Sequence, residues 1–205
     1  MWQNRVEAGR ALAVPLKKYA GSDAIVLGVP RGGVIVAKEI ARELGLPLDI
    51  VISRKMGAPG NPELGIGAVS SDGEAVVDQR LAKLVGADEA YILSEKKRQF
   101  VEMKRRETAF RGGNPGPKLK GRTAIIVDDG IATGVTIEAA TAYLKRLGAT
   151  VVIAAPVAPP DTAEKLRRLA DEVIVLETPV LFGAVGAFYE DFRQVEDDEV
   201  KKALI

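Results

Sequence analysis

Two adjacent carboxylates followed by a loop of small residues are the most informative feature of this sequence. Asp128 and Asp129 come directly after the apolar residues 124–127, and the loop Gly-Ile-Ala-Thr-Gly-Val-Thr then runs to Thr136. Small residues let backbone N–H groups surround an anion, and a helix that follows directs its positive end at the same point. Paired aspartates accept hydrogen bonds from a sugar diol or help to hold a hydrated cation. The stretch therefore predicts a site for phosphate, sugar and metal.

Two further basic segments follow apolar runs. Arg31 is followed by Gly32 and Gly33, and two glycines allow the backbone to approach a diphosphate while arginine offers a planar fork of donors. The alternative is a tight turn with a surface arginine. Arg54 and Lys55 also follow an apolar run. They are either anion ligands beside a closing loop or two solvated side chains.

Composition excludes several other kinds of site. The 205 residues contain no cysteine, which excludes disulfides and thiolate catalysis, and no histidine, so proton transfer near neutral pH must use other groups. The 29 basic and 28 acidic residues give no overall attraction to nucleic acid or to a membrane. No long uncharged apolar stretch or secretory leader is visible, so a soluble, cytoplasmic protein is expected. No P-loop lysine precedes Thr136.

Short apolar runs alternate with helical patterns along the chain. This order predicts an α/β fold with a doubly wound parallel sheet, in which ligands bind at the carboxyl ends of the strands. The expected strands are residues 24–29, 49–53, 123–127, 150–156 and 173–176. Asn4 is expected to cap a first helix that Pro15 kinks or stops, Gly45 to end a second, and Asp161 with Glu164 to form a capping box.

The segment between the second and third expected strands has a different pattern. Residues 56–62 are dense in glycine and proline and predict a long loop, and residues 65–70 and 74–78 predict a hairpin around 71–73. Residues 88–111 predict a long basic helix, most simply a solvated face or a dimer arm, because glutamates interrupt its basic clusters. We expect one domain over 1–205, with a helical insertion at about 79–118. We also expect residues of about 177–205 to form a hood together with the N-terminal helix.

The stretch VDDGIATGVT resembles the phosphoribosyl-diphosphate (PRPP) motif of the type I phosphoribosyltransferases. The resemblance implies that Asp128 and Asp129 contact the ribose hydroxyls and, directly or through water, Mg²⁺. It also implies a cradle for the 5′-phosphate, made of Gly130, Ala132, Thr133, Gly134, Val135 and Thr136. One departure is Gly130, where the family usually has a branched apolar residue.

The other motifs resemble further parts of the same family. The pyrophosphate group would be bound by Arg31, Gly32, Gly33, Arg54 and Lys55. The catalytic set implied is Arg31, Lys55, Asp128 and Asp129. The tail ETPVLFGAVGAFYEDF resembles the hood of purine-type members, which implies base contacts from Phe182, Tyr189 and Asp191, although packing within the hood is nearly as good an explanation.

The resemblance implies an enzyme that transfers the phosphoribosyl group of PRPP to a nitrogenous base, with Mg²⁺ as cofactor and release of pyrophosphate. The alternative is a regulator that senses PRPP or nucleotides with little turnover. Expected partners are PRPP and a nucleobase-like acceptor, with a homodimer allowed and neither a membrane nor nucleic acid expected. Members acting on 6-oxopurines have an aspartate at the third loop position after the acid pair, where this chain has Ala132.

Overall fold

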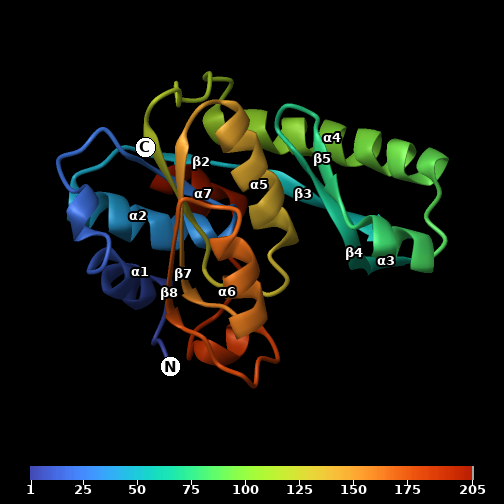
Figure 1. The fold of residues 1–205 in the computed structure, drawn as a ribbon. Helices are drawn as coiled ribbons and strands as arrows, with labels where there is room; N and C mark the ends of the chain where they lie inside the picture. The colour runs from blue at the N-terminus through green and yellow to red at the C-terminus, as the bar shows by residue number, and fades with distance from the viewer. Residues whose placement is uncertain (205) are drawn as a thin grey trace.

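Five parallel strands form the central sheet of the protein, in the order β2-β1-β6-β7-β8 (Figure 1). The structure is a computed structural model that describes residues 1–204. The strands are β1 (Ile25–Gly28), β2 (Leu48–Ile50), β6 (Thr123–Val127), β7 (Thr150–Val157) and β8 (Glu172–Glu177). The α/β parallel sheet predicted from the sequence is confirmed. Strand order reverses between the neighbours β1 and β6, where such sheets bind ligands.

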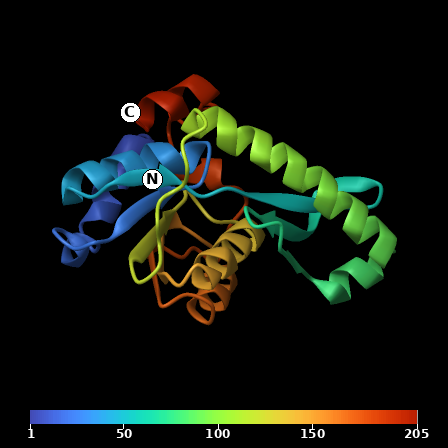
Figure 2. The same cartoon turned by 90° about the horizontal axis from the view of Figure 1, so that it is seen from above.

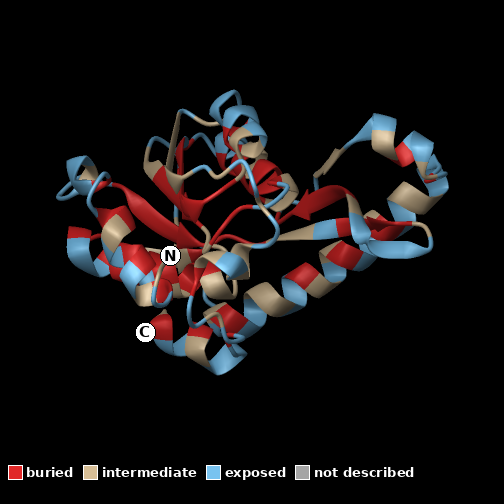
Figure 3. Cartoon of the chain, turned by 90° about the horizontal axis from the view of Figure 1, so that it is seen from below, coloured by how far each residue is buried: buried red, intermediate tan, exposed pale blue. Residues whose placement is uncertain are grey.

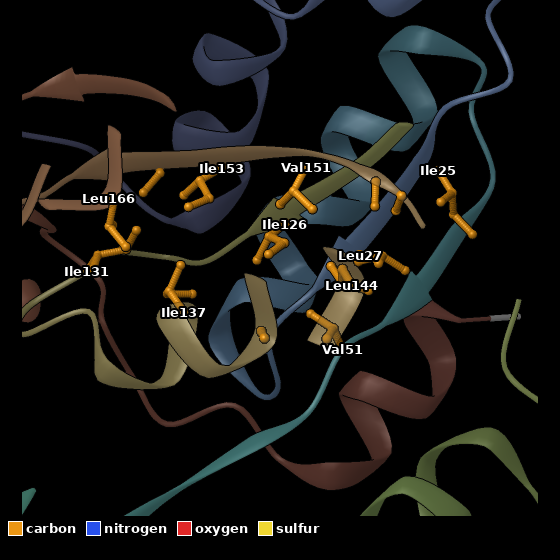
Figure 4. Packing of buried hydrophobic residues seen from close by; sticks show 14 of the residues in the cluster. Ile25, Leu27, Val51, Ile126, Ile131, Ile137, Leu144, Val151, Ile153 and Leu166 are labelled. Atoms are coloured by element: carbon orange, nitrogen blue, oxygen red, sulfur yellow. The ribbon is translucent and has the colours of Figure 1, made fainter. Parts of the chain in front are cut away.

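Helices cover both faces of this sheet. One face packs against α1 (Arg5–Ala13) and α2 (Gly32–Leu44), and the other against α5 (Val135–Arg146) and α6 (Pro160–Arg167). Side chains alternate along each strand, so Ile125 packs toward α2 while Ile126 packs toward α5, both fully buried. Figure 4 shows Ile126 and Ile153 of the sheet close to Ile137 and Leu144 of α5.

Most helix ends follow from local sequence. Asn4 Oδ1 accepts the backbone N–H groups of Val6 and Glu7 at 3.0 and 3.1 Å, and α1 ends at Ala13, before Pro15; a 3₁₀ turn, η1 (Lys17–Tyr19), follows. Gly45, with a φ of +64°, ends α2 as predicted. The predicted capping box at Asp161 and Glu164 is wrong, because α6 begins with Pro160 and Asp161 lies inside its first turn.

An arm of residues 53–111 projects from the central sheet (Figure 2). Its antiparallel sheet contains β3 (Ser53–Ala58), β4 (Asn61–Ser70) and β5 (Ala75–Val77), which are followed by α3 (Gln79–Leu84) and α4 (Glu89–Arg111). The hairpin predicted around residues 71–73 and the long helix are confirmed. The short helix α3 was not predicted.

The loop predicted at residues 56–62 is wrong, because the chain there forms the turn end of the β3–β4 hairpin, with strand residues on both sides of a tight turn. Met56 and Ala58 are buried against the apolar side of α3 and α4. This burial stabilises the strands although glycine and proline disfavour them locally. The glycines instead permit a register shift next to Gly57 and a tight turn at Gly60, whose φ is +72°. The strand predicted at residues 49–53 is likewise divided, since β2 ends at Ile50 and β3 begins at Ser53.

Buried positions recur along α4 at helical spacing (Figure 3). Met103 and Phe110 pack against Val34 of α2 and Val200 of α7 (Asp197–Ala203). Four basic residues of α4 are paired with glutamates three or four positions away: Arg98 with Glu95, Lys104 with Glu107, and Arg105 and Arg106 with Glu102. This pairing neutralises part of the positive charge of the helix, which weakens the case for a nucleic-acid surface.

The N-terminus and the hood are joined by backbone hydrogen bonds. Trp2 pairs with Tyr189 in an isolated parallel bridge, and its N–H donates to the carbonyl of Phe188 at 2.8 Å. The hood here forms a short 3₁₀ turn, η2 (Val185–Phe188), before α7, whose start carries a capping box of Glu196 and Glu199. None of the helices within residues 1–204 combines the length and apolarity needed to cross a bilayer.

Candidate functional site

The loops after β1 and β6 lie against each other at the carboxyl edge of the sheet. The two strands are parallel neighbours, with Gly28 opposite Val127, so the segment around Gly33 meets the segment around Asp128. A Cβ added to Gly33 would lie 2.6 Å from the carbonyl oxygen of Val127 and 2.8 Å from the Cα of Asp128. Only glycine permits this approach.

Gly32 is closer still to the second acid. A Cβ at this position would lie 1.9 Å from Oδ2 of Asp129. The peptide bond between Pro30 and Arg31, one residue earlier, is cis. Two motifs that are nearly 100 positions apart in the sequence therefore form one surface. It is made of the first turn of α2 and the two acids.

The small-residue loop surrounds a cavity of about 190 Å³. Gly134, with a φ of +76°, turns the chain into the start of α5, whose N-terminus faces the loop. The cavity is lined by Lys55, Asp128, Gly130, Ile131, Ala132, Thr133, Gly134, Val135, Thr136 and Ile137. Every residue predicted for the 5′-phosphate cradle borders this space, and Ser53 ties the hairpin to it by donating to the carbonyl of Thr136 at 2.6 Å.

Asp128 is the acid whose charge the protein disfavours. Burial, and then the neighbouring Asp129 carboxylate, raise the pKa of Asp128 well above its usual range. Its Oδ1 accepts the N–H of Asp129 at 2.9 Å, which only partly offsets these effects. A raised pKa means that the free protein is less stable once pH rises enough to ionise the group. A cation or a pair of ligand hydroxyls would relieve this cost.

Asp129 is held by Arg5, which the sequence analysis did not identify, and by Tyr189, which it assigned to the base. Its Oδ2 accepts a hydrogen bond from Nε of Arg5 at 2.6 Å, and its backbone carbonyl accepts the hydroxyl of Tyr189 at 2.5 Å. The side chains of Arg5 and Asp129 are only 10% and 14% exposed. Burial and the nearby Asp129 charge raise the pKa of Tyr189, so the phenol remains a donor. No local pattern links position 5 to position 129.

The basic residues are placed differently from one another. Arg31 lies at the start of α2, and its Nη1 is 3.7 Å from Asp197 and 3.8 Å from Glu196 of the C-terminal segment. Arg54 and Lys55 were expected to follow a strand, but both lie inside β3. Lys55 borders the loop cavity, whereas Nε of Arg54 donates to Gln99 of α4 at 2.7 Å. Successive side chains of a strand point to opposite faces, so the structure brings Lys55 but not Arg54 to the loop.

The aromatic residues of the hood mainly pack on one another. Phe182 stacks on Phe188 with ring centroids 5.3 Å apart, and Tyr189 is buried with its hydroxyl bound to the loop. Asp191 accepts the N–H of Arg193 and borders a separate small cavity beside α1. Of the three residues predicted to contact a base, Phe182 is half-buried and Asp191 is exposed, while Tyr189 anchors the hood beside the acid pair.

Gly130, where the family usually has a branched apolar residue, faces Val185 of the hood. A Cβ at position 130 would lie 2.3 Å from Cγ1 of Val185. Val185 therefore occupies the space that a side chain at 130 would need, and the hood packs directly on the loop backbone.

We predict that Gly130→Ala lowers the free energy of unfolding by about 1–3 kcal/mol, because the added methyl overpacks this contact. Thermal unfolding measures the loss. The combined variant Gly130→Ala with Val185→Ala should recover most of it. Equal destabilisation in the single and combined variants would contradict the contact as the cause.

The acid pair offers few ligands to a metal ion on its own. Within residues 1–204, no three Asp, Glu, His or Cys side chains gather closely enough to hold a metal. Mg²⁺ keeps several waters and commonly binds one or two carboxylates together with substrate phosphates. The two acids fit that mode, with Asp128 gaining most from a cation because its charge is otherwise disfavoured.

Comparison with known proteins identifies the family of this chain. Residues 2–191 match the phosphoribosyl transferase domain. Two Mycobacterium tuberculosis proteins, from strains CDC 1551 and H37Rv and provisionally named phosphoribosyl transferases, are 44% identical over 201 residues. These cover 98% of this chain and 45% of each relative, so the chain spans about half the length of the curated relatives it matches.

A solved structure supports the fold over the whole chain. The crystal structure of TT1426 from Thermus thermophilus is 43% identical, with a TM-score of 0.85, and the match covers 100% of this chain and 97% of that one. The domain match reaches from the first helix to the hood and includes both loops of the site. The chain belongs to the phosphoribosyl transferase domain family.

Proposed function

We propose that the protein transfers the phosphoribosyl group of PRPP to a nitrogenous base and releases pyrophosphate. In this reaction the bond from C1 of the ribose to the pyrophosphate oxygen breaks and a bond from a base nitrogen to C1 forms. The nitrogen loses its proton to water or to a nearby carboxylate. The protein has little covalent chemistry to perform. Its main contribution is to orient two reactants and to stabilise the departing charge.

One observation carries the proposal: the two glycine loops meet at the acid pair. Gly33 touches the backbone of Asp128, and Gly32 touches the carboxylate of Asp129. A phosphate in the loop of residues 130–136 and a diphosphate on residues 31–33 would thus lie on either side of the two acids. A phosphoribosyl diphosphate carries both groups on one ribose, so it would use both loops and the acid pair at once, which a simple phosphate ester could not.

Each site residue has a proposed role. Backbone N–H groups and hydroxyls of the loop, chiefly at Thr133 and Thr136, bind the 5′-phosphate at the start of α5. Asp128 and Asp129 accept the ribose hydroxyls. Arg31 stabilises the leaving pyrophosphate; its present acidic neighbours lie no closer than 3.7 Å, which leaves its fork free to exchange.

Lys55 approaches the same cavity from the hairpin and adds a second cation for the leaving group. It currently donates to the carbonyl of Glu63 at 2.9 Å, an exposed contact that a diphosphate can replace. Arg54 lies on the α4 side of β3, so its contact with pyrophosphate would require the hairpin to shift. Mg²⁺, when bound with the diphosphate, supplies charge neutralisation next to Asp128 and Asp129.

A screen of PRPP with common bases, read by pyrophosphate release in the presence of Mg²⁺, tests the proposed activity. We expect release that depends on one base or a narrow set of bases. PRPP binding without base-dependent release would instead indicate a PRPP-sensing regulator. Absence of both binding and release would overturn the proposed function.

We predict that PRPP binding depends on Mg²⁺ and on the acid pair. Asp128→Asn combined with Asp129→Asn should weaken the binding of PRPP by about 100-fold or more, because ribose and metal contacts are lost together. The affinity for inorganic phosphate, which the loop alone would bind, should change little. Calorimetry with and without Mg²⁺ measures both ligands. Equal, weak PRPP binding under the two conditions would contradict the prediction.

A further inference from the structure

Arg5 connects the first helix of the protein to the second acid of the site. Its Nε donates to Oδ2 of Asp129 at 2.6 Å, and its Nη1 donates to the backbone carbonyl of Arg193 at 2.9 Å. Its guanidinium carbon lies 4.0 Å from the ring centroid of Phe192, within the range of a cation–π contact. With a side chain only 10% exposed, Arg5 is fixed from three directions.

The absence of a side chain at Gly32 leaves room for the ion pair between Arg5 and Asp129. A Cβ on Gly32 would lie 2.8 Å from Nε of Arg5 as well as 1.9 Å from Oδ2 of Asp129. Tyr189, beside Phe192 with ring centroids 5.0 Å apart, donates to the carbonyl of Asp129. The first helix, the glycine loop and the hood therefore converge on one residue, Asp129.

We infer that Arg5 is a positioning residue, which fixes the Asp129 carboxylate so that its other oxygen accepts a ribose hydroxyl. The inference rests on the proposed function. Arg5 donates to Oδ2 of Asp129, and the neighbouring Asp128 carboxyl contacts the same Asp129 side chain. Among the described residues, no other hydrogen bond is made to the Asp129 carboxylate. A carboxylate free to rotate would have to be ordered each time a sugar binds; one already held by Arg5 avoids that loss of affinity.

Arg5 is expected to stay bound to Asp129 when a ligand enters, rather than to be displaced by it. The hydrogen bond to the Arg193 carbonyl and the Phe192 ring hold its guanidinium independently of Asp129. Removing Arg5 would take away the cation that is hydrogen-bonded to Asp129. The ribose hydroxyls, which donate to these acids, would lose a fixed acceptor, whereas a phosphate in the loop would not.

The test compares ribose 5-phosphate with inorganic phosphate, both in Mg²⁺, by calorimetry. We expect Arg5→Met to reduce the preference for ribose 5-phosphate over phosphate by about tenfold or more, as for a lost hydrogen bond between charged groups. Arg5→Lys keeps the charge and should recover part of the preference. The combination of Arg5→Met with Asp129→Asn should lose little more than Asp129→Asn alone.

Arg10→Met is the matched control. Arg10 lies on the same helix, but its side chain is 58% exposed and it pairs at 3.2 Å with Glu39, which lies outside the loops of the site. Its removal should leave the preference unchanged. If Arg5→Met weakens both ligands equally, or if Arg5→Lys recovers nothing, the positioning role is overturned while the proposed function stands. If the unsubstituted protein shows no preference for ribose 5-phosphate, both are overturned.

Discussion

Gly32→Ala is expected to lower the rate of pyrophosphate release from PRPP by about 100-fold or more. The added methyl would lie 1.9 Å from Oδ2 of Asp129, so the carboxylate or the first turn of α2 must move. A displacement near 1 Å in a positioned group can cost a factor of about 100 in rate. The same movement breaks the contact with Arg5, whose Nε would lie 2.8 Å from the new atom.

Helix propensity makes this prediction easy to interpret. Gly32 is the first residue of α2, where alanine without a clash would be neutral or would stabilise the helix. Any loss must therefore come from the contact with the acid pair. Single-turnover measurement of pyrophosphate release, with thermal unfolding as the check on folding, gives both quantities. Release at the unsubstituted rate would show that the loops do not need to touch.

The sequence was most informative where a local pattern decides the structure. The strand before Asp128 is uniformly apolar because both faces of a central parallel strand are buried, and the glycines at 32 and 33 are needed where the backbone of one loop meets another. The fold and the meeting of the two loops follow from these patterns, since carboxyl ends of parallel strands share one edge.

Long-range contacts were not predictable in the same way. Arg5 pairs with an acid 124 positions away, and nothing in the first helix distinguishes it from Arg10, which pairs with Glu39. The β3–β4 hairpin was missed for a related reason. Its glycines and prolines read locally as a loop, but burial of Met56 against α3 and α4 overrides that preference. Arg54 and Lys55 were consequently treated as a pair, whereas strand alternation separates them.

Hypoxanthine and guanine are expected to be poor acceptors. Ala132 occupies the third loop position after the acid pair, borders the cavity, and is exposed, while its carbonyl accepts the hydroxyl of Thr162 at 2.7 Å. A methyl group there cannot exchange a proton with a base, and the chain has no histidine that could replace a carboxylate.

Since positioned acid–base groups contribute about 100-fold or more, the specificity constants for the two 6-oxopurines should fall at least that far below the best base. The measurement uses saturating PRPP and Mg²⁺ with each base in turn. Ala132→Asp introduces a carboxylate at this position and should raise the specificity constant for hypoxanthine relative to that for the best base. Thr162→Ala, which loosens the same loop without adding an acid, is the control and should not change the ranking. Efficient use of hypoxanthine or guanine by the unsubstituted protein would show that the residue at 132 does not select the base.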